Sequence, residues 1–217
     1  MSPDSINKRL EKLYAAVVSD VLDGLGDRDQ TLGPSIRPLT QVKQVCGRVF
    51  TARAVPVKTI PEKPYELEMA VIDRMQSGDV LLVDLGHDTS SAFWGELLTT
   101  ACQVKGVQGV VMSGCCRDLW RLESLHFPVF GIGCRPTDSL GRIDVVEIGE
   151  PIVIDGVKAR TGDWLLGDAD GVVIVPAGDI DEVLTRAEEK LASENHVRDD
   201  LEAGMSVAEA FKKHGIL

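Results

Sequence analysis

Three groups of residues carry the chemistry that this sequence offers. The segment 95–98 reads Gly-Glu-Leu-Leu, and a glycine that opens a helix leaves backbone N–H groups free to hold a carboxylate. Arg117 and Asp118 begin a second helical segment, which brings a fork of hydrogen-bond donors beside an oxygen ligand. Glu194 is the third feature, and Arg198 follows it one turn later on a carboxyl-terminal helix.

Together these groups suit a divalent metal and a small 2-oxo acid. One or two carboxylates with an open coordination sphere fit Mg²⁺ or Mn²⁺, which keep several waters and accept substrate oxygens as further ligands. Arg117 would neutralise the acid end of a 2-oxo acid bidentately. Cleavage of the C–C bond beyond the keto group leaves an enolate, whose charge the metal and Arg117 would stabilise. Ordinary helix caps and surface ion pairs use the same residue types, so spacing alone leaves a structural role open.

Other catalytic groups find less support. A Schiff-base lysine needs an amine whose pKa is lowered by burial, but Lys105 and Lys158 stand beside polar or glycine residues and the other lysines occupy charged segments. The sequence contains no Gly-x-Ser-x-Gly segment, and its four histidines stand in no recognisable relation to a nucleophile. With these nucleophiles set aside, the sequence favours stabilisation of an enolate by a metal ion.

The central third of the chain predicts the elements that would position these residues. Apolar runs at 80–83, 107–112 and 129–132 predict buried strands, and helical spacing marks 95–104 and 118–125. Such a strand–helix alternation favours a parallel or mixed sheet covered by helices. Ligands are then expected where strands run into helix starts.

The flanking segments predict further elements. Apolar residues at helical spacing over 6–25 predict one helix that ends near Gly26, and a strand over 45–57 is expected at the edge of the sheet because it contains Gly47 and Pro56. A short helix over 71–75 leads to a turn at 77–79.

The carboxyl-terminal part is expected to be mostly β and then helical. Short strands are predicted at 145–148, 152–154, 164–166 and 172–175. Asp-Gly within 168–171 favours a turn over a second metal site. A charged amphipathic helix spans 180–201, and Ser206 with Glu209 forms a capping box. We therefore expect one α/β domain over 1–217, an α/β/β sandwich with a mixed central sheet and a C-terminal helical extension.

Composition restricts the partners and the compartment. The net charge of −11 and the lack of a Lys/Arg-rich run disfavour nucleic acid, because phosphate binding normally needs a basic patch. No apolar run approaches membrane-spanning length, and residues 1–12 contain no secretory h-region, so a soluble cytoplasmic protein is expected. The five cysteines lack zinc-site spacing and are expected to be reduced, with Cys115 and Cys116 packing as small hydrophobes.

At these residues the chain resembles the RraA-like family, which includes the class II 4-hydroxy-4-methyl-2-oxoglutarate / 4-carboxy-4-hydroxy-2-oxoadipate aldolases. The resemblance keeps the family's order and spacing over nearly the whole chain. It rests on segments 19–23, 36–39, 78–80, 94–98, 105–111, 114–118, 127–130, 162–163 and 168–173.

The resemblance implies a role for each site residue. In these aldolases the Gly-Glu/Asp-Leu-Leu backbone and the following arginine hold pyruvate, which makes substrate contacts of Gly95, Glu96, Leu97, Leu98 and Arg117. The next residue, Asp118, becomes the ligand of Mg²⁺ or Mn²⁺. Glu96 matches the acidic position that holds a catalytic water, and Glu194 matches a glutamate lent by the neighbouring subunit, so the implied catalytic set is Arg117, Glu96 and Glu194. Because the family forms trimers or dimers of trimers, the helices from about residue 179 are expected to pack on a neighbouring subunit.

The implied activity is a metal-dependent lyase that releases pyruvate from a 4-hydroxy-2-oxo acid by retro-aldol cleavage and also decarboxylates oxaloacetate. A non-catalytic regulator that binds a ribonuclease is the alternative from another class, because the family's namesake inhibits an RNA-degrading enzyme. A lyase or hydrolase for a different acid is a third. One departure concerns the substrate: many members have Asp where this chain has Ser113, and Cys115 and Cys116 replace small apolar residues.

Overall fold

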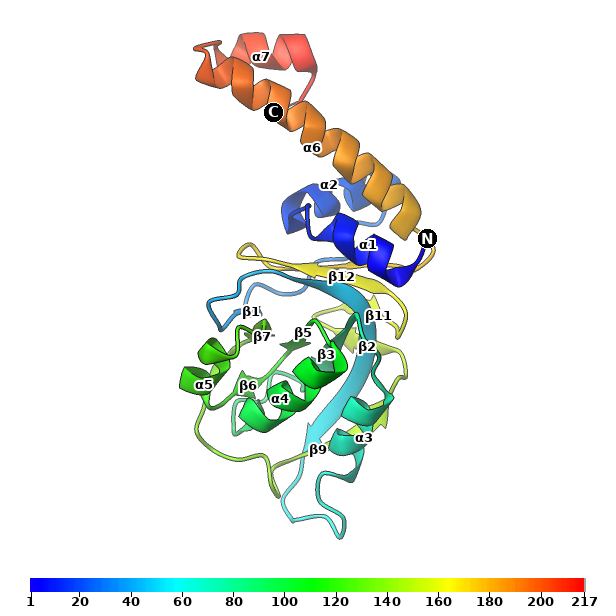
Figure 1. Ribbon diagram of the computed structural model, residues 1–217, viewed down its shortest axis with the longest axis vertical. Coiled ribbons are helices and arrows are strands. Elements are labelled where there is room, and N and C mark those ends of the chain that lie inside the picture. Colours follow the sequence, from blue (N-terminus) through cyan, green and yellow to red (C-terminus); the bar gives the residue numbers. More distant parts are fainter. Residues whose placement is uncertain (217) are drawn as a thin grey trace.

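The computed structural model describes residues 1–216, and its centre is an eight-stranded mixed sheet (Figure 1). Its strands lie in the order β1 (Arg37–Pro38), β7 (Val129–Gly131), β5 (Gly109–Met112), β3 (Asp79–Asp84), β2 (Val45–Pro56), β12 (Trp164–Gly167) and β13 (Val172–Val175), and β9 (Ile143–Ile148) also pairs with β2. The pairs among β2, β3, β5 and β7 are parallel, and the others are antiparallel. The predicted mixed α/β fold is confirmed.

Two cores explain the continuous apolar run of β3. Leu81 and Val83 pack on the side covered by α3 (Glu66–Arg74), α4 (Glu96–Lys105) and α5 (Leu119–Ser124). Val80 and Leu82 point to the other side, which the hairpin of β10 (Ile152–Ile154) and β11 (Val157–Ala159) covers. Because successive side chains of a strand alternate, a strand buried on both faces shows no polar alternation. Helices, central sheet and hairpin thus form α/β/β layers.

The remaining helices form a third core and an extension. They are α1 (Pro3–Leu10), α2 (Ala15–Leu25), α6 (Ile180–Glu202) and α7 (Val207–His214). Apolar residues of α1, α2 and the start of α6 pack against β12 and β13, and α6 then rises away from the sheet (Figure 1). The predicted capping box of α7 is confirmed, since Ser206 Oγ accepts from the Glu209 N–H at 3.3 Å and Glu209 Oε2 from the Ser206 N–H at 3.1 Å. No helix within residues 1–216 has both the length and the apolar composition needed to cross a membrane.

The prediction of one helix over 6–25 was wrong, because the chain breaks between α1 and α2. Leu10 at the end of α1 and Leu13 within the break are both buried in the same core, so the apolar spacing continues although the backbone turns. Ala15, the first residue of α2, donates its N–H to Asp168 Oδ2 at 2.7 Å. Asp168 lies in the turn between β12 and β13, where its N–H donates to the Gly171 carbonyl at 2.9 Å, which confirms the predicted turn.

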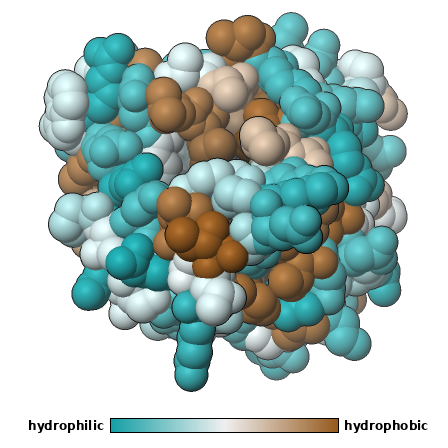
Figure 2. Space-filling model, turned by 90° about the horizontal axis from the view of Figure 1, so that it is seen from below, coloured by the Kyte–Doolittle hydropathy of each residue, from teal (hydrophilic) through white to brown (hydrophobic). Residues whose placement is uncertain are grey.

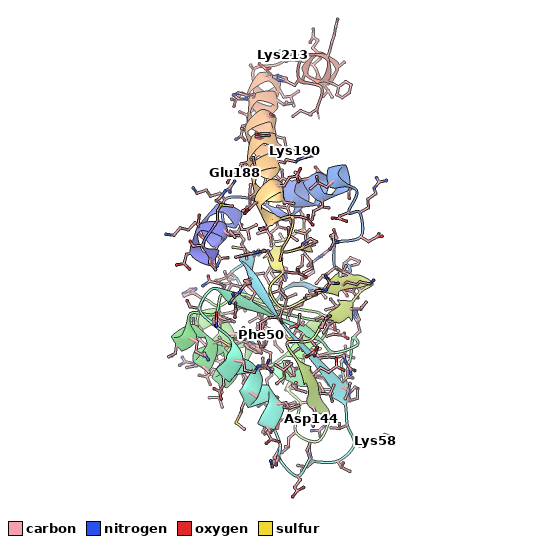
Figure 3. All side chains as sticks on the ribbon, turned by 90° about the vertical axis from the view of Figure 1, so that its right-hand side faces the viewer. Phe50, Lys58, Asp144, Glu188, Lys190 and Lys213 are labelled. Carbon is pink, nitrogen blue, oxygen red and sulfur yellow. The ribbon has the colours of Figure 1, made fainter. Side chains whose placement is uncertain are left out.

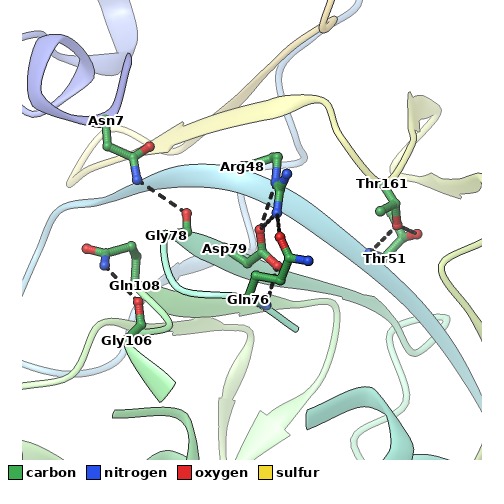
Figure 4. A network of polar contacts seen from close by, with 9 residues as sticks. All are labelled: Asn7, Arg48, Thr51, Gln76, Gly78, Asp79, Gly106, Gln108 and Thr161. Atoms are coloured by element: carbon green, nitrogen blue, oxygen red, sulfur yellow. Dashed lines mark hydrogen bonds and ion pairs between the residues drawn. The ribbon is translucent and has the colours of Figure 1, made fainter. Parts of the chain in front are cut away.

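The predicted edge position of the strand over 45–57 was also wrong. In the structure β2 has β3 on one side and β12 and β9 on the other. Gly47 marks a close approach, because a Cβ there would lie 2.7 Å from the Gly78 carbonyl oxygen, and Pro56 is the last residue of the strand. Arg48 Nε donates to Asp79 Oδ1 at 2.9 Å and ties the neighbouring starts of β2 and β3 together (Figure 4).

A small parallel sheet, which the sequence did not predict, positions the site. It consists of β4 (Ala92–Trp94), β6 (Cys115–Cys116) and β8 (Gly133–Cys134). Strands of two or three residues are too short to show a period of hydrophobicity. Because β4 leads directly into α4 and β6 into α5, two helix starts meet at one edge of this sheet.

Candidate functional site

The Gly-Glu-Leu-Leu and Arg-Asp segments meet where β4 and β6 end. Trp94 and Cys116 are paired across the two parallel strands, and the Arg117 N–H donates to the Trp94 carbonyl at 2.9 Å. Gly95 and Arg117, the next residues of the two strands, are therefore neighbours. The structure thus brings together two segments that are about one βα unit apart in sequence, at the strand ends where α/β folds bind ligands.

A cavity of about 670 Å³ opens at these strand ends. Its walls come from α3, the β4–α4 junction, the start of α5 and the loop after β8. Figure 2 shows the end of the molecule opposite the C-terminal helices, where hydrophobic residues gather among polar ones around a hollow. The lining residues are Tyr65, Glu68, Met69, Ala92, Phe93, Gly95, Glu96, Leu97, Leu98, Arg117, Asp118, Trp120, Arg121, Asp138 and Ser139.

Gly95 makes room for the Asp118 carboxylate. Its backbone is extended, so conformation does not require glycine, but a Cβ would lie 2.8 Å from Asp118 Oδ2 and 3.3 Å from Arg117 Cγ. In the space that is left, Asp118 Oδ2 accepts from the Glu96 N–H at 3.3 Å. One N–H at this helix start is therefore occupied by a carboxylate of the protein itself, and binding of a substrate carboxylate there stays a prediction.

Asp118 points its side chain away from its own helix. It precedes α5 in the left-handed conformation (φ 59°, ψ 32°), which Asp tolerates better than most residues, and its side chain makes no capping hydrogen bond there. The Asp118 carbonyl accepts from the Arg121 N–H at 2.8 Å, so the backbone still begins the helix. With 42% of the side chain exposed, the carboxylate is open to a ligand in the cavity.

Arg117 is held by two carboxylates. One of its terminal nitrogens lies 3.1 Å from Asp138 Oδ1, and its Nε lies 3.8 Å from Asp118 Oδ2. Asp138 also accepts from the Tyr65 hydroxyl at 3.2 Å, and burial together with this carboxylate raises the pKa of Tyr65. Asp138 was missed by sequence reasoning because it lies in a loop without periodicity.

The residues after Gly95 form one wall of the cavity. Glu96 Oε1 lies 3.5 Å from Arg121 Nε, a contact that the sequence did not predict although both residues stand near helix starts. Leu97 is 78% exposed, and Leu98 is half-buried. All of the predicted substrate contacts from Gly95 to Leu98 line the cavity.

Glu68 is an unpredicted carboxyl group that also lines the cavity. It lies half-buried on α3, and burial is the main cause that raises its pKa to about 7. Asp138 and Asp144 add to this shift by charge repulsion, whereas Arg117 opposes it. In the sequence Glu68 looks like any acidic residue of a solvated helix, so only tertiary contacts distinguish it.

Glu194 lies far from the cavity of its own chain. It is on α6, where its carboxylate accepts from the Tyr14 hydroxyl and lies 3.6 Å from Lys190 Nζ. Figure 3 shows Lys190 on the helical extension and Asp144, a neighbour of Glu68, at the other end of the molecule. Burial and Glu194 raise the pKa of Tyr14 to about 12. A role for Glu194 in catalysis therefore requires a second copy of the chain and stays a prediction.

The residues that depart from the family pattern lie behind the cavity. Ser113 is fully buried, and its hydroxyl accepts from the Leu85 N–H at 2.8 Å and contacts Asp84 Oδ1 at 3.1 Å. Cys115 and Cys116 are also buried, and this burial raises the pKa of both thiols. Within residues 1–216 none of the three lines the cavity, so their effect on a substrate would be indirect.

A metal at this site would have few protein ligands. Among residues 1–216, no three His, Cys, Asp or Glu side chains are grouped so that they could hold a metal ion by themselves. The single carboxylate of Asp118, in the space kept open by Gly95, fits a cation such as Mg²⁺, which retains waters and takes one or two carboxylates.

Comparison with known proteins identifies the family of this chain. Residues 15–174 match the RraA-like family model, described as Aldolase/RraA. A protein of Halalkalibacterium halodurans named "Putative 4-hydroxy-4-methyl-2-oxoglutarate aldolase" is 32% identical over 182 residues, which cover 82% of this chain and 79% of that protein.

Solved structures share the fold over most of their length. An uncharacterized protein from Pseudomonas syringae pv. tomato gives a TM-score of 0.85 at 27% identity, covering 97% of this chain and 99% of that chain. RraAS2 of Streptomyces coelicolor, described as an unusual member of the RNase ES inhibitor RraA protein family, gives 0.80 at 26% identity, covering 89% of this chain and 96% of that chain. By the matched residues and by its fold, this chain belongs to the RraA-like family.

Proposed function

We propose that this protein is a metal-dependent class II aldolase that releases pyruvate from a 4-hydroxy-2-oxo acid. The observation that carries the proposal is the junction of Arg117, Asp118 and Gly95 at the wall of a cavity of about 670 Å³, which suits a small acid. The name of the relative from Halalkalibacterium halodurans supports the same activity.

The residues of this junction can bind the 2-oxo acid end of the substrate. Arg117 would face the carboxylate with its guanidinium, which matches two oxygens at once. The N–H groups of Leu97 and Leu98, in the first turn of α4, have no partner within the helix and can donate to substrate oxygens. Asp118 would hold Mg²⁺ or Mn²⁺, and a bound cation would supply positive charge that stabilises an enolate.

Retro-aldol cleavage then needs a base and a returning proton. The proton of the 4-hydroxyl group leaves to a water held by Glu96, the bond between C3 and C4 breaks, and its electron pair becomes the enolate of pyruvate. A proton returns to C3 and gives pyruvate, while C4 becomes the carbonyl carbon of the second product. Oxaloacetate would lose CO₂ to form the same enolate.

The cavity offers no amine for Schiff-base chemistry. Within residues 1–216 its lining includes no lysine, and Lys105 Nζ, one of the two lysines considered from sequence, donates to the Asp73 carbonyl at 2.7 Å. This supports the metal-dependent route over the lysine-dependent one.

Pyruvate release tests the proposal. The protein would be assayed with Mg²⁺, with Mn²⁺ and with a chelator, on 4-hydroxy-2-oxo acids that share the pyruvate half and differ beyond C4. We expect chelation and Asp118→Ala to lower kcat/KM by about 100-fold or more, as losses of charge stabilisation do. The exposed Asp29→Ala serves as a matched control with normal activity. Undiminished release under chelation, or no release from any of these acids, rules the proposal out.

Binding to a ribonuclease is a second candidate, favoured by the likeness to RraAS2. A stoichiometric complex with a ribonuclease that survives Arg117→Ala, together with no pyruvate release from the wild type, would support it. Loss of pyruvate release in Arg117→Ala without such a complex would favour the lyase.

A further inference from the structure

Two thiol groups meet between neighbouring strands of the small parallel sheet. Cys116 on β6 and Cys134 on β8 are register partners, and their Sγ atoms lie 3.6 Å apart. This distance is within the about 4 Å that defines contact between side chains. The two cysteines are 18 positions apart in the sequence, so only the pairing of β6 with β8 brings them together.

The two thiols differ in their access to solvent. Cys134 is exposed, whereas Cys116 is fully buried in the core on the helical side of the sheet. Redox-sensitive cysteines are commonly an accessible thiol beside a second thiol that can react with its first oxidation product. Cys115, the other residue of β6, has Gly133 as its register partner, so Cys116 is the cysteine that faces Cys134 across the strands.

The thiol pair lies at the strand ends that lead to two charged residues of the cavity. Cys116 immediately precedes Arg117, and Asp138 follows Cys134 by four positions in the loop after β8. The Arg135 N–H donates to the Cys116 carbonyl at 2.8 Å, which ties the two strands together here. A change in the spacing of these strands would therefore move the Arg117 guanidinium relative to Asp138, from which it now lies 3.1 Å.

We propose that Cys134 and Cys116 form a redox modification site, in which a hydroperoxide oxidises the two thiols to a disulfide and the new bond displaces Arg117. Both sulfurs belong to one chain, so the bond does not depend on residues that a second copy contributes at the cavity. The effect on pyruvate release rests on the proposed lyase function, whereas formation of the bond does not.

Hydrogen peroxide as the oxidant balances the reaction in two steps. The sulfur of Cys134 attacks one peroxide oxygen, an S–O bond forms while the O–O bond breaks, and the thiol proton leaves with the second oxygen as water. The sulfur of Cys116 then attacks Sγ of this sulfenic acid, the S–S bond forms while the S–O bond breaks, and a second water carries away the Cys116 proton. The two thiols lose two electrons, and one peroxide is reduced to two waters.

Closure of the bond requires movement beside the site. The sulfurs must approach by about 1.5 Å, from 3.6 Å to the disulfide length of about 2.05 Å. Because the close-packed core leaves little room for the Cys116 side chain to turn, the backbone before Arg117 must take up part of this movement. Misplacement by about 1 Å can cost about 100-fold in rate, so we expect the disulfide to lower kcat/KM for pyruvate release about 10-fold or more.

Peptide mapping of the oxidised protein tests whether the bond forms. The native protein is reduced, freed of reductant, treated with hydrogen peroxide, alkylated and digested with trypsin. Trypsin leaves Cys116 in segment 106–117 and Cys134 in segment 122–142, because Arg135 precedes a proline. We expect the two segments to be joined, with a mass lower than their sum by two hydrogens. Cys134→Ser and Cys116→Ala should not give this product.

Cys115→Ser is the matched control, because Cys115 lies in the same strand and in the same tryptic segment as Cys116. This variant should still form the joined segments. Non-reducing electrophoresis separates a bond within one chain from a bond between two chains. A bond from Cys134 to Cys115, a bond between the Cys134 residues of two chains, or no bond after peroxide treatment overturns the assignment.

Pyruvate release from the same samples tests the effect on Arg117. A loss of about 10-fold or more in the wild type and in Cys115→Ser that a thiol reductant reverses, and that Cys134→Ser does not show, supports the proposal. Joined segments with undiminished release overturn the displacement of Arg117 and leave the lyase standing. No release from the reduced wild type overturns the lyase, and the joined segments then still decide the modification site.

Discussion

At the scale of single residues, Gly95 is the position where one missing atom shapes the site. Its backbone is extended, a conformation that any residue can adopt. From sequence alone, glycine here would be explained by a turn or a helix start, and its steric role beside Asp118 would not be predicted. A Cβ would meet the Asp118 carboxylate at 2.8 Å, a distance that real Cβ atoms essentially never show. Glycine therefore lets the proposed metal ligand lie against the first turn of α4.

Gly95→Ala should abolish the proposed lyase activity without unfolding the protein. The added methyl group must displace Asp118 or Arg117, and misplacement by about 1 Å can cost about 100-fold in rate. Steady-state pyruvate release and the urea unfolding midpoint would be measured for this variant and for Gly178→Ala, whose Cβ would meet no atom within 4 Å. Equal activity in the two variants would contradict the steric role of Gly95.

At the scale of elements, a turn far away in sequence defines where α2 begins. Asp168 Oδ2 accepts from the Ala15 N–H at 2.7 Å, so its carboxylate satisfies a free donor and faces the positive end of the helix. The preceding residue, Tyr14, supplies no side-chain cap of its own. The break between α1 and α2 thus has a tertiary stabilisation that local sequence does not reveal.

Asp168→Ala should lower the free energy of unfolding and leave the proposed pyruvate release of the folded protein unchanged. Loss of a capping carboxylate costs about 1–2 kcal/mol, to be measured as the change in the free energy of unfolding in urea. Asp170→Ala is the control, because that side chain is exposed in the same turn. Equal destabilisation by both substitutions would mean that the turn, rather than the cap, is responsible.

At the scale of the whole molecule, three cores leave one cysteine accessible. Cys46, Cys102, Cys115 and Cys116 are buried, whereas Cys134 is exposed. Burial raises the pKa of the Cys46 and Cys102 thiols to about 12, which leaves almost no reactive thiolate at neutral pH. Glu194 on α6 and the cavity lie at opposite ends of the folded molecule (Figure 3).

A thiol reagent at pH 8 should therefore react quickly with one cysteine per native chain and with five after denaturation. Cys134→Ser should abolish the fast reaction and leave four thiols in the denatured chain, since the sequence has five. Fast reaction of two or more thiols in the native protein would show that the cores open more readily than their packing indicates.

The sequence by itself determined the elements with strong periodicity and the chemistry of the two helix starts. The buried strands near 80–83 and 107–112, the helices after Gly95 and Asp118 and the capping box of α7 all follow local rules of spacing and capping, and these were confirmed. The Arg-Asp pair, with its family resemblance, also predicted a site at residues that the structure places in the wall of the cavity.

Tertiary structure decided which strands pair and which side chains meet, because local spacing and capping do not determine these contacts. β2 became internal because strands from three other parts of the chain pair with it, and the short parallel sheet of β4, β6 and β8 brought two helix starts to one edge. Asp138, Glu68 and Trp120 joined the cavity from a loop and two helices. Their surroundings come from residues that are distant in sequence. The burial of each side chain, the charges beside it and its access to the cavity are therefore set only when the chain has folded.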